Sequence, residues 1–474
     1  MIPTLAPETL AGLGWQALAL ADLTVLLAVG VGIGTRLGMK RWGLPEALLA
    51  GALGLLIAPA GLLPLLPPQV IHLWDQLPLP LLTLVFASLL LGKPLPKLGG
   101  LWRPLSAQVL LALNLAFGQF LVGGLVVLLL LQPWLGVSPV MACLIEVAYE
   151  GGHGSAAAMG PTYERLGLEG AQALGLAMAT VGLLASTVVG GLVVVLGRAR
   201  GWLKFAEALP IEEALAIVEE ETPPLQAVPM DLPLEAPTVE VPALWRRLAD
   251  WAVNLALAGV AVLIGCGALA VLRWAADGSG GIFAMVIDAL PVFPLALVGS
   301  LLVRLILERS GQTHWVSASI QGQTGTLSAD LLITAATACL DLRLLAHDWL
   351  PLTVLAVAGL LWNLAVILLL APRILPPDWF ERAIIEFGQA TGVAASGLLL
   401  LRMADPGDRS QAVTAFSIKQ LLLQPLLAGG VITVAAPLVV SGWGLPAWTG
   451  LCLALVLLWS GLGLWLAMRA KAAG

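Results

Sequence analysis

Residues 149–158 read Tyr-Glu-Gly-Gly-His-Gly-Ser-Ala-Ala-Ala, inside an apolar segment at 138–160. The glycines at 151, 152 and 154 expose the backbone and permit positive φ angles. Irregular backbone at membrane depth is tolerated only where it is buried in protein or lines a water-filled cavity. The stretch therefore predicts a re-entrant or broken segment within a membrane protein, and tight helix packing without a ligand is the alternative.

A second segment, 378–400, has the same character. It contains Gly388-Gln-Ala-Thr-Gly-Val-Ala-Ala-Ser396, which offers an amide, two hydroxyls and two glycines. The candidate ligand-binding residues here are Gln389, Thr391, Gly392 and Ser396. Helix packing is again the alternative role.

The composition around these segments is that of a membrane protein. Hydrophobic residues make up 59% of the chain and charged residues 11%, whereas soluble domains carry about 25% charged residues. Many apolar runs reach the roughly 20 residues that a spanning helix needs. The 23 Lys and Arg are scattered, which argues against nucleic-acid binding. We predict an all-α polytopic membrane protein.

Charge placement gives the orientation of the predicted spans. With the N-terminus outside, 20 of the 23 Lys and Arg fall on the cytoplasmic side, Lys419 among them, and only Arg165, Arg273 and Arg343 remain outside. This is the positive-inside asymmetry of a plasma (inner) membrane protein. The predicted spans are 15–35, 44–62, 78–92, 105–131, 170–197, 250–273, 281–307, 324–341, 350–371, 413–437 and 445–468.

The two halves of the chain echo each other. An odd number of spans precedes the hydrophilic middle of the chain, so the second half enters the membrane with inverted orientation. Three echoes occur in the same order: Gly160 and Gly397 at an offset of 237, Gly190-Gly191 and Gly429-Gly430 at 239, and Asn114-Leu-Ala and Asn363-Leu-Ala at 249. Inverted repeats with interrupted helices are the architecture of secondary transporters.

These observations divide the chain into four parts. Residues 1–200 and 249–440 are two inverted five-helix repeats, each with one re-entrant segment. Residues 201–248 are a hydrophilic cytoplasmic linker, Pro-rich in its second part, and 441–474 add one C-terminal helix.

The glycine-loosened stretch has the chemistry of an ion site. Carbonyls freed from helical bonding can coordinate a cation, and amides at the start of a half-helix can receive a carboxylate. The Ser155 hydroxyl serves either partner. His153 can bind a substrate carboxylate, carry a coupling proton or fix the loop. Ser155 and His153 are two residues apart and lack a convincing acid partner, so we predict no enzyme.

Carboxylates within apolar segments are expensive and suggest function. Glu146, Glu150 and Glu386 lie in or beside the two broken segments. Each is a candidate ligand for Na⁺ or a proton, and solvation at the mouth of a cavity is the alternative.

Three further polar residues have more than one possible role each. Asn114 and Asn363 are candidates for bonds between helices or for a cavity lining. Arg402 can lie at the cytoplasmic interface, pair with Asp405, or hold an anionic substrate.

Residues Gly151 to Ala158 resemble the bacterial sodium/glutamate symporter family, whose first re-entrant loop carries a GGHG-[ST]-x-A-A signature. The likeness continues through Tyr163-Glu-Arg-Leu-Gly167 and Ala177–Leu183 to Gly190-Gly191, and is clear over 140–197. The second loop departs from that family, so the chain resembles a divergent member. The resemblance implies two five-helix inverted repeats, a pore loop in each, sodium-coupled glutamate uptake and a homodimer. It also implies binding-loop roles for Gly151, Gly152, His153, Gly154 and Ser155.

The sequence thus predicts a sodium-coupled symporter of a small organic anion, glutamate or a related amino acid or dicarboxylate, with elevator-like alternating access. Na⁺ is the coupling ion, held by loop backbone near Gly152–Ser155 and Gly388–Gly392, and no other cofactor is expected. A proton-coupled carrier, a passive channel and a non-transporting membrane scaffold or sensor are the alternatives.

Overall fold

The computed structural model describes residues 7–39, 45–59, 61–92, 102–204, 241–277, 284, 287, 290–340, 348–406, 409–424 and 426–472. These residues form helices and connecting turns, with no strand among them. Of the predicted linker 201–248, residues 205–240 lie outside the described residues.

The helices of the first half are α1 (Pro7–Leu37), α2 (Glu46–Ile57), α3 (Pro68–Asp75), α4 (Pro78–Leu89), α5 (Trp102–Val126), η2 (Val127–Leu131), α6 (Gln132–Leu135), η3 (Pro139–Cys143), α7 (Leu144–Tyr149), α8 (Gly152–Arg165) and α9 (Ala171–Ala199). Those of the second half are α11 (Val241–Ala276), α13 (Phe293–Arg309), η4 (Thr313–Trp315), α14 (Ala318–Ala338), α16 (Trp349–Ala365), η5 (Val366–Leu370), α17 (Ala371–Ile374), α18 (Trp379–Thr391), α19 (Ala394–Ala404), α20 (Ala412–Leu423), α21 (Val431–Trp443) and α22 (Leu445–Ala472).

Within the described residues, seven helical stretches are long and apolar enough to cross a membrane: Trp15–Leu37, Pro68–Leu89, Leu105–Leu135, Ala171–Ala199, Arg247–Ala276, Trp349–Ile374 and Leu445–Ala470. The stretches on α11 and α22 are the least buried, at 22% and 17%. Their exposed side chains are largely apolar, such as Leu263 and Leu457. Apolar surface of this extent is stable against lipid and not against water. The chain is a multi-pass membrane protein.

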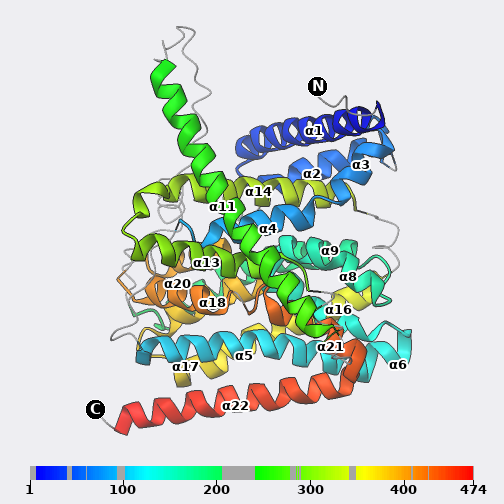
Figure 1. The fold of residues 1–474 in the computed structure, drawn as a ribbon. Helices are drawn as coiled ribbons and strands as arrows, with labels where there is room; N and C mark the ends of the chain where they lie inside the picture. The colour runs from blue at the N-terminus through cyan, green and yellow to red at the C-terminus, as the bar shows by residue number, and fades with distance from the viewer. Residues whose placement is uncertain are drawn as a thin grey trace.

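The helices pack in two groups, each drawn from both halves of the chain (Figure 1). In the first group α2 and α4 pack on α14, α4 also packs on α13, and α11 packs on α13. In the second group α5 packs on α22 and α16, while α9 packs on α7, α8, α18 and α19. Helix α8 also contacts α4 and α14 of the first group. The two broken segments therefore lie in the second group, one of them against the first.

One sequence of elements occurs twice. A long helix becomes π-helical at Val127–Leu131 in the first half and at Val366–Leu370 in the second, 239 residues later. A four-residue helix follows each, α6 or α17, and then a broken segment. Such π turns are rare and often found at functional sites. The shared order supports the predicted internal repeat, while the opposite membrane orientation of the two copies stays a prediction.

The predicted span 413–437 is not one helix. Helix α20 ends at Leu423, α21 begins at Val431, and the described residues between them form turns. Proline at 425 lacks the N–H that a continuous helix needs, and Gly429 takes a φ of +93° that ends helical geometry. Sequence reasoning treated this stretch as a single span and missed a third interruption.

Candidate site where two interrupted helices meet

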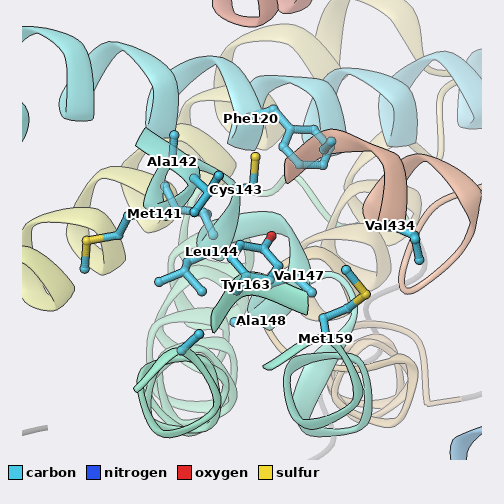
Figure 2. Packing of buried hydrophobic residues seen from close by; sticks show 14 of the residues in the cluster. Phe120, Met141, Ala142, Cys143, Leu144, Val147, Ala148, Met159, Tyr163 and Val434 are labelled. Atoms are coloured by element: carbon cyan, nitrogen blue, oxygen red, sulfur yellow. The ribbon is translucent and has the colours of Figure 1, made fainter. Parts of the chain in front are cut away.

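The first broken segment, η3–α7–α8, folds into a hairpin. Its helical course is interrupted at Glu150 and Gly151, and Gly152 has a φ of +67° that favours glycine. Figure 2 shows Tyr163 of α8 beside Leu144 and Val147 of α7, in one apolar cluster. Helix α8 thus folds back along α7, with the interrupted residues at the tip.

The second broken segment, α18–α19, is also a helical hairpin. Helix α18 ends at Thr391, Gly392 and Val393 are non-helical, and α19 begins at Ala394. The two helices approach closely because Gly388 lies against Gly397, and a Cβ on Gly388 would lie 2.5 Å from the Gly397 nitrogen. The tip of this hairpin is Gly392 and Val393.

The two tips are in contact. Gln389 Nε2 donates to the Glu150 carbonyl oxygen at 3.3 Å. A Cβ on Gly152 would lie 3.0 Å from Val393 Cγ1, so the first tip accommodates the second only with a small residue there. The predicted stretches 149–158 and 388–396 are therefore brought together at the residues where each helix is interrupted.

Side chains from two long helices hold the second tip. Asn363 of α16 donates through Nδ2 to the Ala390 carbonyl at 2.9 Å and to Thr391 Oγ1 at 3.0 Å. Gln119 of α5 donates to the same Ala390 carbonyl at 2.6 Å and to Asn363 Oδ1 at 3.2 Å. These bonds occupy backbone and hydroxyl oxygens at the end of α18. Gln119 and Asn363 thus position the predicted residue Thr391.

Helix α9 supports both hairpins. His153 Nε2 lies 3.0 Å from Thr180 Oγ1 on α9. Because Thr180 donates its hydroxyl proton to the Leu176 carbonyl at 2.9 Å, it accepts from His153 Nε2–H. Gly182, less than one turn further on, is in close contact with the Thr391 carbonyl and the Tyr149 ring. Of the roles open to His153, the bond to Thr180 matches the fixing of the loop.

Four side-chain oxygens near the contact are buried and have no hydrogen-bond partner within the described chain: Glu150 Oε2, Gln389 Oε1, Ser186 Oγ and Ser396 Oγ. Each of these residues is at most 5% exposed. A Cβ on Gly392 would lie 2.8 Å from Ser186 Oγ and 3.2 Å from Ser396 Oγ, so both hydroxyls adjoin the second tip. Sequence reasoning missed Ser186. Its hydroxyl lies in the run 181–189, which is apolar except for Gly182, Ser186 and Thr187.

Glu386 is paired rather than free. Its Oε2 lies 2.8 Å from Lys419 Nζ of α20, and both side chains are at most 1% exposed. Gln108 Nε2 donates to Glu386 Oε1 at 2.8 Å. Lys419 is therefore buried inside the protein, while its place on the cytoplasmic side stays a prediction. A buried ion pair costs more to separate than a surface one, so this ammonium is not an orientation signal.

Glu146 faces the third interruption. Its Oε1 accepts from Thr433 Oγ1 at 2.8 Å and from the Ala428 amide at 3.3 Å. Its Oε2 is buried and has no hydrogen-bond partner in the part of the chain that the structure describes. Ser155 Oγ lies against Gly429 and Gly151, so this predicted hydroxyl is next to the same turn.

Three predicted residues have their described neighbours outside the contact between the two tips. Asn114 accepts from Ser460 Oγ of α22 at 2.7 Å and donates to the Leu110 carbonyl at 2.8 Å, so it joins α5 to the C-terminal helix. Arg402 lies on α19, a partly exposed residue ten positions beyond Gly392. Gly154 is near Leu82 of α4 and Leu332 of α14, at the boundary between the two helix groups.

The charges of this region are linked. The carboxylates of Glu146, Glu150 and Glu386 and the ammonium of Lys419 are all buried. Lys419 pairs with Glu386. Because unpaired buried charge is costly, Glu146 and Glu150 are each protonated or beside a cation.

Residues 15–200 match the model of the sodium/glutamate symporter family. The match contains the whole first hairpin and α9, and it ends before the second hairpin begins. It confirms the resemblance drawn from residues 140–197. A search of curated proteins found no match to the chain.

Proposed function

We propose that the chain, whose residues 15–200 match the sodium/glutamate symporter family, is a secondary transporter and not an enzyme, and that it couples Na⁺ to a small organic anion. Glutamate or a related amino acid or dicarboxylate is the proposed substrate. The observation that carries the proposal is the contact between the two interrupted tips, where Gln389 donates to the Glu150 carbonyl and buried oxygens lack partners.

The first tip and Gln389 have the chemistry of a sodium site. Glu150 Oε2 and Gln389 Oε1 are both unpartnered among the described residues and both buried. Oxygen ligands suit hard cations, and unwound backbone with half-helix ends coordinates Na⁺ in membrane transporters. A sodium ion here supplies one of the positive charges that the buried carboxylates need.

The substrate anion can bind at the N-terminal ends of the two helices that begin at the tips. Helices α8 and α19 begin at the two tips, at Gly152 and Ala394. The first amides of a helix lack intrahelical acceptors and attract negative charge. Neither helix has a side-chain cap at its start. Two half-helix starts at one contact suit a substrate with one or two carboxylates, and Na⁺ offsets their charge.

Movement of the second helix group against the first gives alternating access of the elevator kind. Both hairpins belong to the second group, so the site travels with it. Contacts of α8 with α4 and α14 link the two groups, and a moving interface has to exchange such contacts. We propose that the protein is a homodimer in which the first helix group stays stationary while the second group moves.

Uptake into proteoliposomes tests the coupling. An inward Na⁺ gradient at fixed pH should concentrate labelled glutamate, aspartate or a dicarboxylate, and an equal K⁺ gradient should not. Gln389→Ala should raise the half-saturating Na⁺ concentration about tenfold, since about 1.4 kcal/mol corresponds to a factor of ten. Gln323→Ala, on the exposed face of α14, is the matched control and should leave uptake unchanged.

Each alternative gives a different result. Accumulation driven by a pH gradient alone indicates a proton-coupled carrier. Equilibration without accumulation indicates a channel. Neither uptake nor counterflow, with purified protein that is folded by thermal unfolding, indicates a scaffold or sensor and overturns the proposal.

A further inference from the structure

We propose a second cation site, distinct from the contact between the two tips, formed by Glu146 of α7, Ser155 of α8, Thr433 of α21 and the turn at Ala428 and Gly429. The proposed ligand is Na⁺. This inference rests on the proposed sodium-coupled transport and adds a second coupling ion to it.

The cluster is assembled from three separate elements. Thr433 Oγ1 donates to Glu146 Oε1 at 2.8 Å and accepts from the Gly429 amide at 3.1 Å. The Ala428 amide donates to the same Glu146 oxygen at 3.3 Å. Ser155 Oγ is in contact with Gly429 on one side and lies near Gly151 on the other. The third interruption is thereby joined to the first tip.

Glu146 provides the anionic ligand. Its side chain is 0% exposed, and Oε1 already accepts two hydrogen bonds. Its second oxygen, Oε2, has no hydrogen-bond donor among the described residues. A carboxylate of this kind is stabilised in a buried position when a cation or a proton reaches the free oxygen. Hydroxyl oxygens of Ser155 and Thr433 and the free carboxylate oxygen are the ligand type that Na⁺ prefers.

The backbone of the turn supports a ligand role. Ala428 has a φ of +54° and is the only non-glycine residue with positive φ in the described part of the chain. Such a conformation is strained and persists where surrounding contacts enforce it, typically at functional sites. Here the contacts are the bonds from Ala428 to Glu146 and from Gln424 Nε2 to the Ala428 carbonyl at 3.3 Å.

The two unpaired carboxylates give room for two cations. Lys419 pairs with Glu386, which leaves Glu150 at the contact between the tips and Glu146 at the third interruption. One Na⁺ at each would balance these two carboxylates. A cation bound by α7, α8 and α21 would also link these three elements.

Charge movement per transported substrate tests the number of cations. Reversal potentials measured in proteoliposomes give this ratio for the wild type, Glu146→Gln and the control Glu164→Gln, which removes an exposed carboxylate from α8. We expect Glu146→Gln to couple one Na⁺ fewer per substrate than the wild type and Glu164→Gln to match the wild type. An unchanged Na⁺ ratio in Glu146→Gln overturns the second site.

Two further outcomes separate the second Na⁺ site from the proposed function and from a proton site. If the wild type shows no Na⁺-dependent uptake, the proposed function fails, and the second Na⁺ site that rests on it fails with it. If Glu146→Gln loses coupling to protons while its Na⁺ ratio stays that of the wild type, the ligand is a proton and the proposal is wrong. Should Glu146→Gln not fold, Thr433→Ala retains the carboxylate. It should raise the half-saturating Na⁺ concentration about tenfold at an unchanged ratio, and wild-type Na⁺ dependence in it counts against the site.

Discussion

Both broken segments are helical hairpins, and their buried carboxylates differ in how they are paired. In the first, Glu146 and Glu150 each keep one buried oxygen without a partner among the described residues. In the second, the carboxylate of Glu386 is held by Lys419 at 2.8 Å and by Gln108 at 2.8 Å. The second hairpin therefore has a counter-charge within the chain, and the described residues bring no donor to the two free oxygens of the first.

This difference assigns separate roles to the repeated elements. Because Lys419 is part of the chain, the second hairpin keeps its counter-charge whatever ions are bound. We propose that the first hairpin changes its charge when a cation enters or leaves. We infer that ion dependence originates in α7 and α8, and that α18 and α19 provide a constant surface against which the ion is bound.

Removing the counter-charge of the second hairpin should have the largest effect. Lys419→Met leaves Glu386 buried and unpaired, which costs about 3–5 kcal/mol of folding free energy. The double variant Lys419→Met with Glu386→Leu should recover much of that loss, since no charge remains. Thermal unfolding of the detergent-solubilised protein measures both.

Arg304→Met is the matched control for this prediction. Arg304 and Glu308 form a pair at 2.9 Å whose side chains are 12% and 30% exposed. A pair that reaches solvent contributes about 0–1 kcal/mol, and Arg304 Nη1 also donates to the Leu91 carbonyl at 3.1 Å, so the control should lose clearly less stability than Lys419→Met. If Lys419→Met is no less stable than Arg304→Met, the second hairpin does not depend on its ammonium and the contrast between the hairpins fails.

A smaller effect is expected where α9 supports both hairpins. In Gly182→Ala the new Cβ would lie 2.6 Å from Tyr149 Cδ1 and would collide with the Thr391 carbonyl. Overpacking of this kind costs about 1–3 kcal/mol, and it should push the two tips apart. We expect a lower unfolding temperature together with a higher half-saturating Na⁺ concentration.

Gly267→Ala is the control, since nothing lies within 4 Å of a Cβ on this glycine of α11. Replacing a helical glycine at an open position stabilises a helix by about 0.5–1 kcal/mol. Equal behaviour of the two variants would show that α9 does not hold the tips in place.

Sequence patterns predicted the local features of the site and not its long-range contacts. Glycines 151, 152 and 392 indicated where helices break, because interruption is a local property of backbone freedom and missing side chains. The family match over residues 15–200 confirmed the resemblance drawn from residues 140–197, which include the first two of these glycines. Lys419 and Glu386 lie on two different helices and are 33 residues apart in the sequence, and no local pattern specifies such a partner.

The third interruption, between α20 and α21, was not predicted although a local signal for it exists. Its local signal, proline 425 followed by Gly429-Gly430, was present in the sequence. The apolar character of 413–437 outweighed it, although hydropathy does not distinguish a continuous span from two shorter helices. The consequence for Glu146 became visible only through the contacts of Ala428 and Thr433.

The smallest expected effect concerns the tie between His153 and α9. Thr180→Val removes the hydroxyl that accepts from His153 Nε2–H, leaving a buried donor unpaired at a cost of about 1–3 kcal/mol. The apparent unfolding temperature should fall by less than in Lys419→Met. Thr326→Val is the control, since Thr326 is exposed and its hydroxyl bonds only the Gly322 carbonyl of its own helix.

The pH profile of uptake decides whether this tie is structural. If His153 only fixes the first hairpin, Thr180→Val transports more slowly or binds Na⁺ more weakly, and the pH at half-maximal uptake stays that of the wild type. If His153 carries a coupling proton, loss of its partner moves that midpoint. A moved midpoint would place a second titrating group beside Glu150, and the ion dependence of the first hairpin would then belong to protons as well as to Na⁺.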